Sequence, residues 1–164
     1  GNFMNREVFG EYTDNFLARI IHLLKQQQVD ASMLYTSDHG EDIFDDGRHL
    51  FLHASPVPSY YQLHVPLLLW TSDSYREEYP GIEKAASMNR QKNISSSISF
   101  FQTMMELAGI ETPYRNDSLS VTSPLYTEKS RVYLNDHNEP HSLDDIGMRK
   151  EDFEMLKKRG IDAQ

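Results

Sequence analysis

The spacing of apolar residues predicts a helix and two strands in the first half of the chain. From Phe9 to about Gln27, apolar residues recur at three- and four-residue steps, as on an amphipathic helix with one buried stripe (Phe9, Tyr12, Phe16, Leu17, Ile20, Ile21 and Leu24). Residues 33–36 and 65–70 are short apolar runs and are expected to be strands buried on both faces. Such strands are typical of parallel sheets covered by helices, which indicates an α/β fold.

The second half has weaker patterns. Residues 71–92 are polar and are expected to form a surface excursion with a turn at residues 79–81. A second amphipathic helix is predicted to begin at Asn93 or Ser95 and to end at Gly109, with one apolar face (Ile94, Ile98, Phe101, Met105 and Leu107). Residues 131–134 are a weak strand candidate, and a short helix is expected at about 150–159.

Composition excludes several classes of function. The 164 residues carry a net charge of −9, which argues against nucleic-acid binding and against adhesion to an anionic membrane. No run of about 18 apolar residues is present, so we expect this piece to be soluble. The absence of cysteine excludes disulfides and thiolate metal sites.

The first strand ends in a group of potential metal ligands. Asp38 and His39 follow it directly, and residues just past a strand's end can both turn toward one point. Gly40 is expected to allow a sharp turn through a positive φ. A carboxylate and a neutral imidazole are ordinary ligands of zinc or a similar divalent ion, although two ligands do not complete a site. The alternative is a capping aspartate beside a solvated histidine.

Further acidic and histidine residues follow in the same loop. Glu41 is expected to orient His39 through the second ring nitrogen, whereas Asp45 and Asp46 are interpreted as a solvated turn. His53 follows an apolar run that would hold its ring toward the mouth of the site, and His49 competes for that role. In addition, Gln62 and His64 are expected to anchor the loop, and three histidines are read as surface residues (His22, His137 and His141).

The order of these motifs resembles the C-terminal part of the alkaline phosphatase/sulfatase superfamily, above all its membrane-anchored phosphoethanolamine transferase branch. The resemblance covers about residues 9–110 and depends on four segments: Ser37-Asp38-His39-Gly40-Glu41, Leu52-His53-Ala54, Gln62-Leu63-His64-Val65-Pro66 and Leu68-Leu69-Trp70. Ala54 stands where the family usually has glycine, and the loop between His39 and His53 is longer than the usual pattern. These departures concern the substrate side more than the metal ligands.

The resemblance implies an alkaline phosphatase-like three-layer sandwich with a mainly parallel sheet. Residues 1–134 would be the C-terminal portion of a sulfatase-like catalytic domain, and residues 135–164 a polar tail with a short helix. Asp38 and His39 would bind the metal, Glu41 would support them, and His53 would contact the transferred phosphoryl group. The metal would be zinc in a transferase and calcium in a true sulfatase.

The nucleophile motifs of the family do not occur before Asp38. We therefore expect a C-terminal fragment of a longer enzyme, whose missing N-terminal half supplies the nucleophile and the membrane helices. The parent would work at the periplasmic face of a bacterial inner membrane, and the isolated fragment would be inactive. The favoured activity is transfer of phosphoethanolamine to a glycolipid through a covalent phospho-enzyme. Hydrolysis of sulfate or phosphate esters is a second possibility, and a non-catalytic interaction module is a third.

Overall fold

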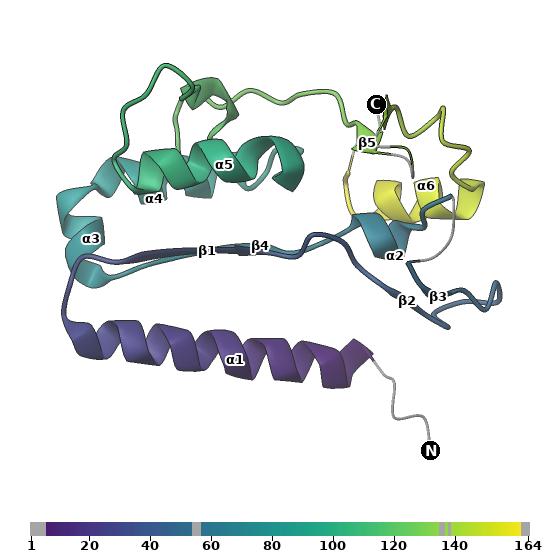
Figure 1. The fold of residues 1–164 in the computed structure, drawn as a ribbon, viewed down its shortest axis with the longest axis horizontal. Coiled ribbons are helices and arrows are strands. Elements are labelled where there is room, and N and C mark those ends of the chain that lie inside the picture. Colours follow the sequence, from purple (N-terminus) through teal and green to yellow (C-terminus); the bar gives the residue numbers. More distant parts are fainter. Residues whose placement is uncertain (1–5, 54–56, 135–136, 138, 162–164) are drawn as a thin grey trace. The chain divides into compact units, whose positions relative to one another are not determined.

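The computed structural model describes residues 6–53, 57–134, 137 and 139–161, with side chains described from Gly10 onward. Ala54 and the side chain of Phe9 lie outside this description. The elements follow in chain order (Figure 1): α1 (Arg6–Gln27), β1 (Ser32–Thr36), β2 (Asp42–Ile43), β3 (Phe51–Leu52), α2 (Tyr60–Leu63), β4 (Leu67–Thr71), α3 (Asp73–Glu78), α4 (Pro80–Asn89), α5 (Ser96–Leu107), the 3-10 helix η1 (Asp117–Leu119), β5 (Tyr133–Leu134), β6 (Pro140–His141) and α6 (Lys150–Lys158).

The chain forms two compact units. One contains residues 1–55 and 61–75, and the other contains residues 56–60 and 76–164. The predicted domain boundary at residue 134 stays a prediction. Among the described residues, no helix is long and apolar enough to cross a bilayer.

The first unit is built on the two strands that the sequence predicts. β1 and β4 pair in antiparallel register, with Thr36 opposite Leu67. The α/β class is confirmed, but the mainly parallel sheet is not, because all three strand pairs in the described part of the chain are antiparallel. A continuous apolar run shows that both faces of a strand can be covered, and it carries no information about strand direction.

Burial in this unit is lower than the sequence predicts. Every residue of β1 is half-buried, and Leu68 of β4 is exposed. Helix α1 runs lengthwise along the strand pair (Figure 1) and buries Leu17, while Tyr12 and Phe16 of the predicted stripe are exposed. The expectation that both faces of these strands are buried was therefore wrong. A sheet of only two strands has few neighbouring elements that could cover its faces.

The interior of the second unit contains many polar side chains beside its apolar ones. Helix α5 turns Ser99, Thr103 and Leu107 inward, so the predicted apolar face holds at Leu107 and was wrong at Phe101, which is exposed. The buried Asn89 donates hydrogen bonds to the carbonyls of Val121 and Ser123, and Thr103 and Glu106 accept hydrogen bonds from the same loop. These hydrogen bonds explain the buried polar side chains, because a buried polar group is stable only when it is paired.

Two other expectations about the second unit have different outcomes. The predicted surface excursion of residues 71–92 is mostly helical, since α3 and α4 lie within it, and it is not wholly at the surface, since Ala85 is buried. Helix α6 is confirmed, and its buried Asp152 accepts a hydrogen bond from the backbone amide of Tyr60 at 2.9 Å. Gly109 has the positive φ of +62° that a glycine at a helix end commonly adopts.

Candidate metal and substrate site

The candidate site lies on the loop and hairpin that connect β1 to α2. Asp38 and His39 follow the end of β1, Glu41 immediately precedes β2, and His53 immediately follows β3. Because β2 and β3 pair as a hairpin, with Asp42 opposite Leu52, the two ends of the loop return to the same place. Residues that are far apart in sequence are thereby brought together.

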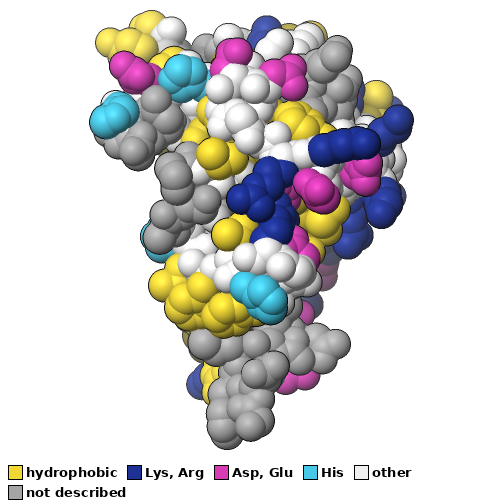
Figure 2. Space-filling model, turned by 90° about the vertical axis from the view of Figure 1, so that its right-hand side faces the viewer, with side chains coloured by type: hydrophobic (Ala, Val, Ile, Leu, Met, Phe, Trp, Pro, Cys, Tyr) yellow, Lys and Arg dark blue, Asp and Glu magenta, His cyan; other side chains and the backbone are white. Residues whose placement is uncertain are grey.

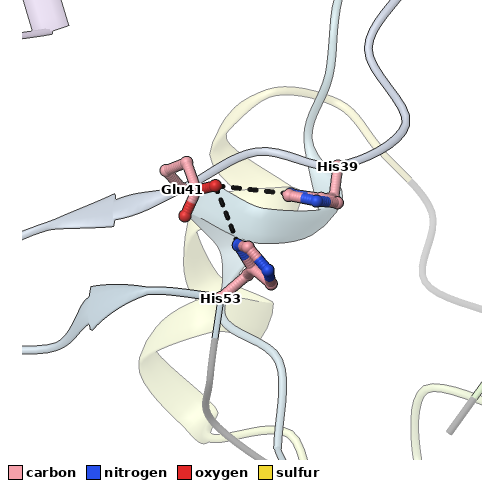
Figure 3. A group of neighbouring side chains, drawn as sticks. All are labelled: His39, Glu41 and His53. Carbon is pink, nitrogen blue, oxygen red and sulfur yellow. Dashed lines mark hydrogen bonds and ion pairs between the residues drawn. The ribbon is translucent and has the colours of Figure 1, made fainter. Parts of the chain in front are cut away.

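Three of the four predicted site residues form one cluster. Ligand atoms of His39, Glu41 and His53 all lie within 4.8 Å of one another, and the two imidazole rings have centroids 4.1 Å apart (Figure 3). The competing His49 is exposed and is not part of this cluster. The hairpin therefore brings His53 next to His39.

The His39 ring is oriented by a backbone carbonyl. Its Nδ1 lies 3.0 Å from the carbonyl oxygen of Gly40, which can only accept a hydrogen bond. We therefore assign the proton of the neutral ring to Nδ1, which leaves the lone pair of Nε2 for a metal. Glu41, which the sequence predicts to orient His39, lies 3.7 Å from Nδ1, beyond hydrogen-bond distance.

Glu41 instead holds His53. Its Oε1 accepts a hydrogen bond of 2.8 Å from Nδ1 of His53 (Figure 3). With Nδ1 occupied in this way, Nε2 is the ring nitrogen that His53 can offer to a substrate. Such a carboxylate partner fixes the orientation of an imidazole, so the structure shows Glu41 supporting the second histidine of the site.

Asp38 lies on the other side of the His39 ring. Its Oδ2 is 3.7 Å from Nε2 of His39, and its side chain is 87% exposed. Its Oδ1 accepts a hydrogen bond from the His39 backbone amide at 3.0 Å. This hydrogen bond and, to a smaller extent, the nearby imidazole lower the pKa of the Asp38 carboxyl below its ordinary value. The ionised carboxylate is the form in which an aspartate binds a metal.

These positions fit a zinc ion shared by Asp38 and His39. Two ligands of a tetrahedral zinc, with bonds of roughly 2.0–2.2 Å, lie about 3.3–3.6 Å apart. The observed 3.7 Å between Oδ2 and Nε2 differs from this separation by only a small side-chain adjustment. Because Nδ1 of His39 is engaged with Gly40, a metal at Nε2 with Asp38 agrees better with the hydrogen bonds than one held by the three-residue cluster.

Gly40 is needed for a close approach between two backbones. Its amide donates to the carbonyl of Gln62 at 2.8 Å, and a Cβ at this position would lie 2.0 Å from the carbonyl oxygen of Tyr61. The expected positive φ was wrong, since Gly40 is not among the residues with positive φ in the described chain. Glycine is required here because α2 occupies the space that a side chain would fill.

A buried hydrogen bond fastens the same loop to α2. Nε2 of Gln62 donates to Oδ2 of Asp42 at 2.5 Å, and both residues are almost completely buried. The predicted anchoring role of Gln62 is confirmed, and its partner is the buried Asp42.

The turn residues of the hairpin behave as the sequence predicts. Asp45 accepts a hydrogen bond from the amide of Ile43, and Asp46 accepts one from the amide of Arg48 while also binding the guanidinium group. Such side-chain to backbone bonds are characteristic of turns. Both carboxylates therefore shape the hairpin rather than joining the histidine cluster.

Removing the anchor should loosen the site loop. We expect Gln62→Ala to lower the free energy of unfolding by about 1–3 kcal/mol, because a buried carboxylate loses a charge-assisted donor. Urea denaturation followed by circular dichroism measures the change. Gln27→Ala, at the exposed end of α1, is the matched control and should leave the midpoint nearly unchanged. Equal stability of the two variants would show that the hydrogen bond between Gln62 and Asp42 does not hold the loop.

Comparison with known proteins identifies the family of this chain. The sulfatase family profile matches residues 9–110, more than half of the chain. Phosphoethanolamine transferase EptA of Salmonella typhimurium is 32% identical over 118 residues, which are 69% of this chain and 21% of that protein. Kdo(2)-lipid A phosphoethanolamine 7''-transferase of Escherichia coli is 26% identical over 107 residues, 62% of this chain and 18% of that protein. The chain thus spans about a fifth of the length of these curated relatives.

Solved structures show the same fold. The C-terminal periplasmic domain of EptC from Escherichia coli superimposes with a TM-score of 0.65 at 24% identity, over 80% of this chain and 39% of that one. A second structure of that domain, in complex with zinc, gives a TM-score of 0.61 at 22% identity, over 87% of this chain and 42% of that one. Together with the matched family profile, the motifs around Asp38 and His53 show that this chain belongs to the sulfatase family of the alkaline phosphatase superfamily.

Proposed function

We propose that this chain forms the C-terminal part of the active site of a metal-dependent phosphoethanolamine transferase that modifies a glycolipid. The observation that supports this proposal most strongly is that two neighbouring histidines have different hydrogen-bond partners at Nδ1. His39 keeps Nε2 open beside the Asp38 carboxylate, while His53 keeps Nε2 open with Nδ1 bound to Glu41. One imidazole is thus arranged for a metal and the other for a substrate oxygen.

The residues of this chain would act by binding and orientation. Asp38 and His39 would hold a divalent ion, which we propose is zinc, and the ion would neutralise negative charge on the phosphoryl group and activate the nucleophile. With both ring nitrogens protonated, His53 would keep Nδ1–H on Glu41 and donate a hydrogen bond from Nε2 to a phosphoryl oxygen, where charge increases in the transition state. Glu41 would keep the His53 ring in place, and α2 would fix the loop through Gly40 and Gln62.

The remaining parts of the proposal concern the longer protein. The nucleophile, expected to be a threonine that forms a covalent phospho-enzyme intermediate, would come from a segment outside this chain. In the complete domain, β1 and β4 would lie at the edge of a mainly parallel sheet in a three-layer sandwich, since such sheets often carry an antiparallel edge strand. Attachment to the periplasmic face of an inner membrane is part of the same proposal, and its periplasmic part is supported by the description of the matched EptC domain as periplasmic.

The activity test uses the longer enzyme that contains this chain. Purified enzyme is incubated with phosphatidylethanolamine and a lipid A acceptor, and the acceptor is analysed by mass spectrometry for added phosphoethanolamine. A sulfate ester and a phosphate ester are assayed in parallel. Transfer without comparable ester hydrolysis supports the proposal, whereas dominant sulfate release would identify a sulfatase. The 164-residue chain alone is expected to show no turnover.

His53 has a sharper test in the same assay. We expect His53→Asn to lower kcat by about 10²–10³-fold, the effect of losing one hydrogen-bond donor to developing charge. Metal content should stay the same, because His53 is not one of the two proposed ligands. His49→Asn is the matched control, since His49 lies on the same hairpin outside the cluster, and it should keep nearly full activity. Loss of metal in His53→Asn would instead make His53 a ligand.

A further inference from the structure

Helix α6 carries a buried carboxylate that the proposed function does not use. Asp152 is 0% exposed, whereas Glu151 and Glu154 on the same helix are exposed. On the face of the molecule in Figure 2, acidic side chains likewise reach the surface. Taking a carboxylate out of water is costly unless it gains hydrogen bonds in exchange. The partner of Asp152 therefore indicates what the burial achieves.

Asp152 holds the first residue of α2. Its Oδ1 accepts a hydrogen bond of 2.9 Å from the backbone amide of Tyr60, 92 positions away in the sequence. The amides in the first turn of a helix need acceptors from outside the helix, and Asp152 supplies one. The residues that lead into α2 are buried as well, since Pro58 is less than 2% exposed, Ser59 is 1% exposed and Tyr60 is 4% exposed. The beginning of α2 is thus held firmly in the second unit.

The later part of α2 holds the loop of the candidate site. The carbonyl of Gln62 accepts a hydrogen bond of 2.8 Å from the Gly40 amide, and the side chain of Gln62 donates to the buried Asp42. Gly40 directly follows His39, and Asp42 directly follows Glu41. Each contact of Gln62 therefore fixes the backbone next to a residue of the site.

Helix α2 is too short to keep its position without support. It has four residues, and a helix of that length is not stable by itself. Its first residue, Tyr60, belongs to the second unit, and the following three belong to the first, so the helix links the two along the backbone. Loosening the first residue of so short a helix should loosen the residues that hold the site loop.

We propose that Asp152 is a positioning residue of the candidate site, which acts through α2 on the loop that carries His39 and Glu41. It would act by holding the amide of Tyr60 and not by contact with metal or substrate. The inference rests on the proposed function for its effect on turnover, but its effect on the loop is independent of any activity. Helix α6, expected to lie in a polar tail, would thereby support the site.

The test is amide hydrogen exchange of the 164-residue chain, followed by nuclear magnetic resonance. We expect Asp152→Ala to speed exchange of the Gly40 amide by about tenfold or more, the factor that corresponds to one lost buried hydrogen bond. The Ser72 amide, which donates to the Ala31 carbonyl at the other end of the β1–β4 pair, should keep its rate. Glu151→Ala is the matched control, because it removes an exposed acid from the same turn of α6 and should change neither rate.

A conservative variant separates the hydrogen bond from the rest of the side chain. Asp152→Asn keeps an oxygen that can accept from the Tyr60 amide, so it should restore slow exchange at Gly40. The proposal is overturned by an unchanged Gly40 rate in Asp152→Ala, or by an Asp152→Asn chain that exchanges as fast as Asp152→Ala. An equal rise at Gly40 and Ser72 also overturns it, because that result means a general loss of stability.

A second measurement needs no variant and applies even where Asp152→Ala does not fold. In the unmodified chain, exchange of the Gly40 amide in low concentrations of urea should follow that of the Tyr60 amide and differ from that of Ser72, because residues that open together share one dependence on urea. If Gly40 opens together with Ser72, the loop depends on the strand pair and the proposal fails.

Turnover of the longer enzyme provides the remaining readout. Asp152→Ala should lower kcat for transfer by about tenfold with little change in KM, because displaced groups still bind the substrate but stabilise the transition state less. Asp152→Asn should recover most of this loss, whereas a merely structural role would leave kcat of the folded enzyme unchanged. Selective exchange at Gly40 without transfer by the unmodified enzyme would refute the proposed function alone. Unchanged kcat in Asp152→Ala would refute only the positioning role.

Discussion

Gly40→Ala is expected to be the most damaging single substitution in the site loop. The new Cβ would lie 2.0 Å from the carbonyl oxygen of Tyr61, and the nearest atoms belong to backbone rather than to a flexible side chain. Relief requires moving the loop away from α2, which would lose the hydrogen bond from the Gly40 amide to Gln62. We expect the free energy of unfolding to fall by about 3 kcal/mol, the upper part of the range for overpacking.

The measurement is urea denaturation of the 164-residue chain, together with transfer activity of the longer enzyme. Gly47→Ala is the matched control, because Gly47 lies in the same hairpin with open space around it. It should keep both stability and activity. A Gly40→Ala chain as stable as Gly47→Ala would mean that the approach of α2 to the loop is not as close as the structure shows.

Asp38→Ala and His39→Ala are expected to remove metal and activity together. Each takes away one of two proposed ligands, so zinc affinity in the longer enzyme should fall by more than about 100-fold, beyond the effect of losing a supporting residue. Without the ion, kcat should fall by about 10³-fold or more, because metal stabilisation of the transferring group amounts to several kcal/mol. Metal content by mass spectrometry and transfer to lipid A by the same assay measure the two effects.

Two further variants sharpen this prediction. Asp38→Asn keeps the shape of the side chain but removes its charge, and it should bind zinc almost as poorly as Asp38→Ala. His22→Ala removes an exposed histidine from α1 and should change neither metal content nor activity. Full activity in Asp38→Ala would show that the loop after β1 is structural and that this chain acts as a non-catalytic module.

Several parts of the fold followed from local patterns. The helical spacing of residues 9–27 correctly predicted α1, the apolar run before Asp38 predicted β1, and Gly109 marked the end of α5. These features depend on neighbours along the chain, where side-chain periodicity and backbone freedom act directly. The motif order around Asp38 also identified the family, since several segments at consistent spacing are far more specific than one tripeptide.

Other features depended on contacts that no local pattern contains. Whether α5 buries Phe101 or Thr103 was decided by the loop that packs on it, whose amide at Val121 needs an acceptor. The antiparallel pairing of β1 with β4 was decided by the path of the chain through the hairpin and α2. A hydrophobicity pattern reports how much of a strand is covered and not which partner covers it.

The same distinction between local pattern and tertiary contact applies to the candidate site. The sequence by itself predicted the candidate site residues Asp38, His39, Glu41 and His53, three of which the structure brings together. Only the tertiary structure decided their pairing, because the return of the β2–β3 hairpin gives Glu41 to His53 and leaves the Gly40 carbonyl to orient His39. The tertiary structure also changed the reason for a glycine at position 40. The close approach of α2 leaves no room for a side chain, and no positive φ is involved. Residue types fix what each group can donate, accept or coordinate, but partners are set by distances across the fold, which sequence order does not contain.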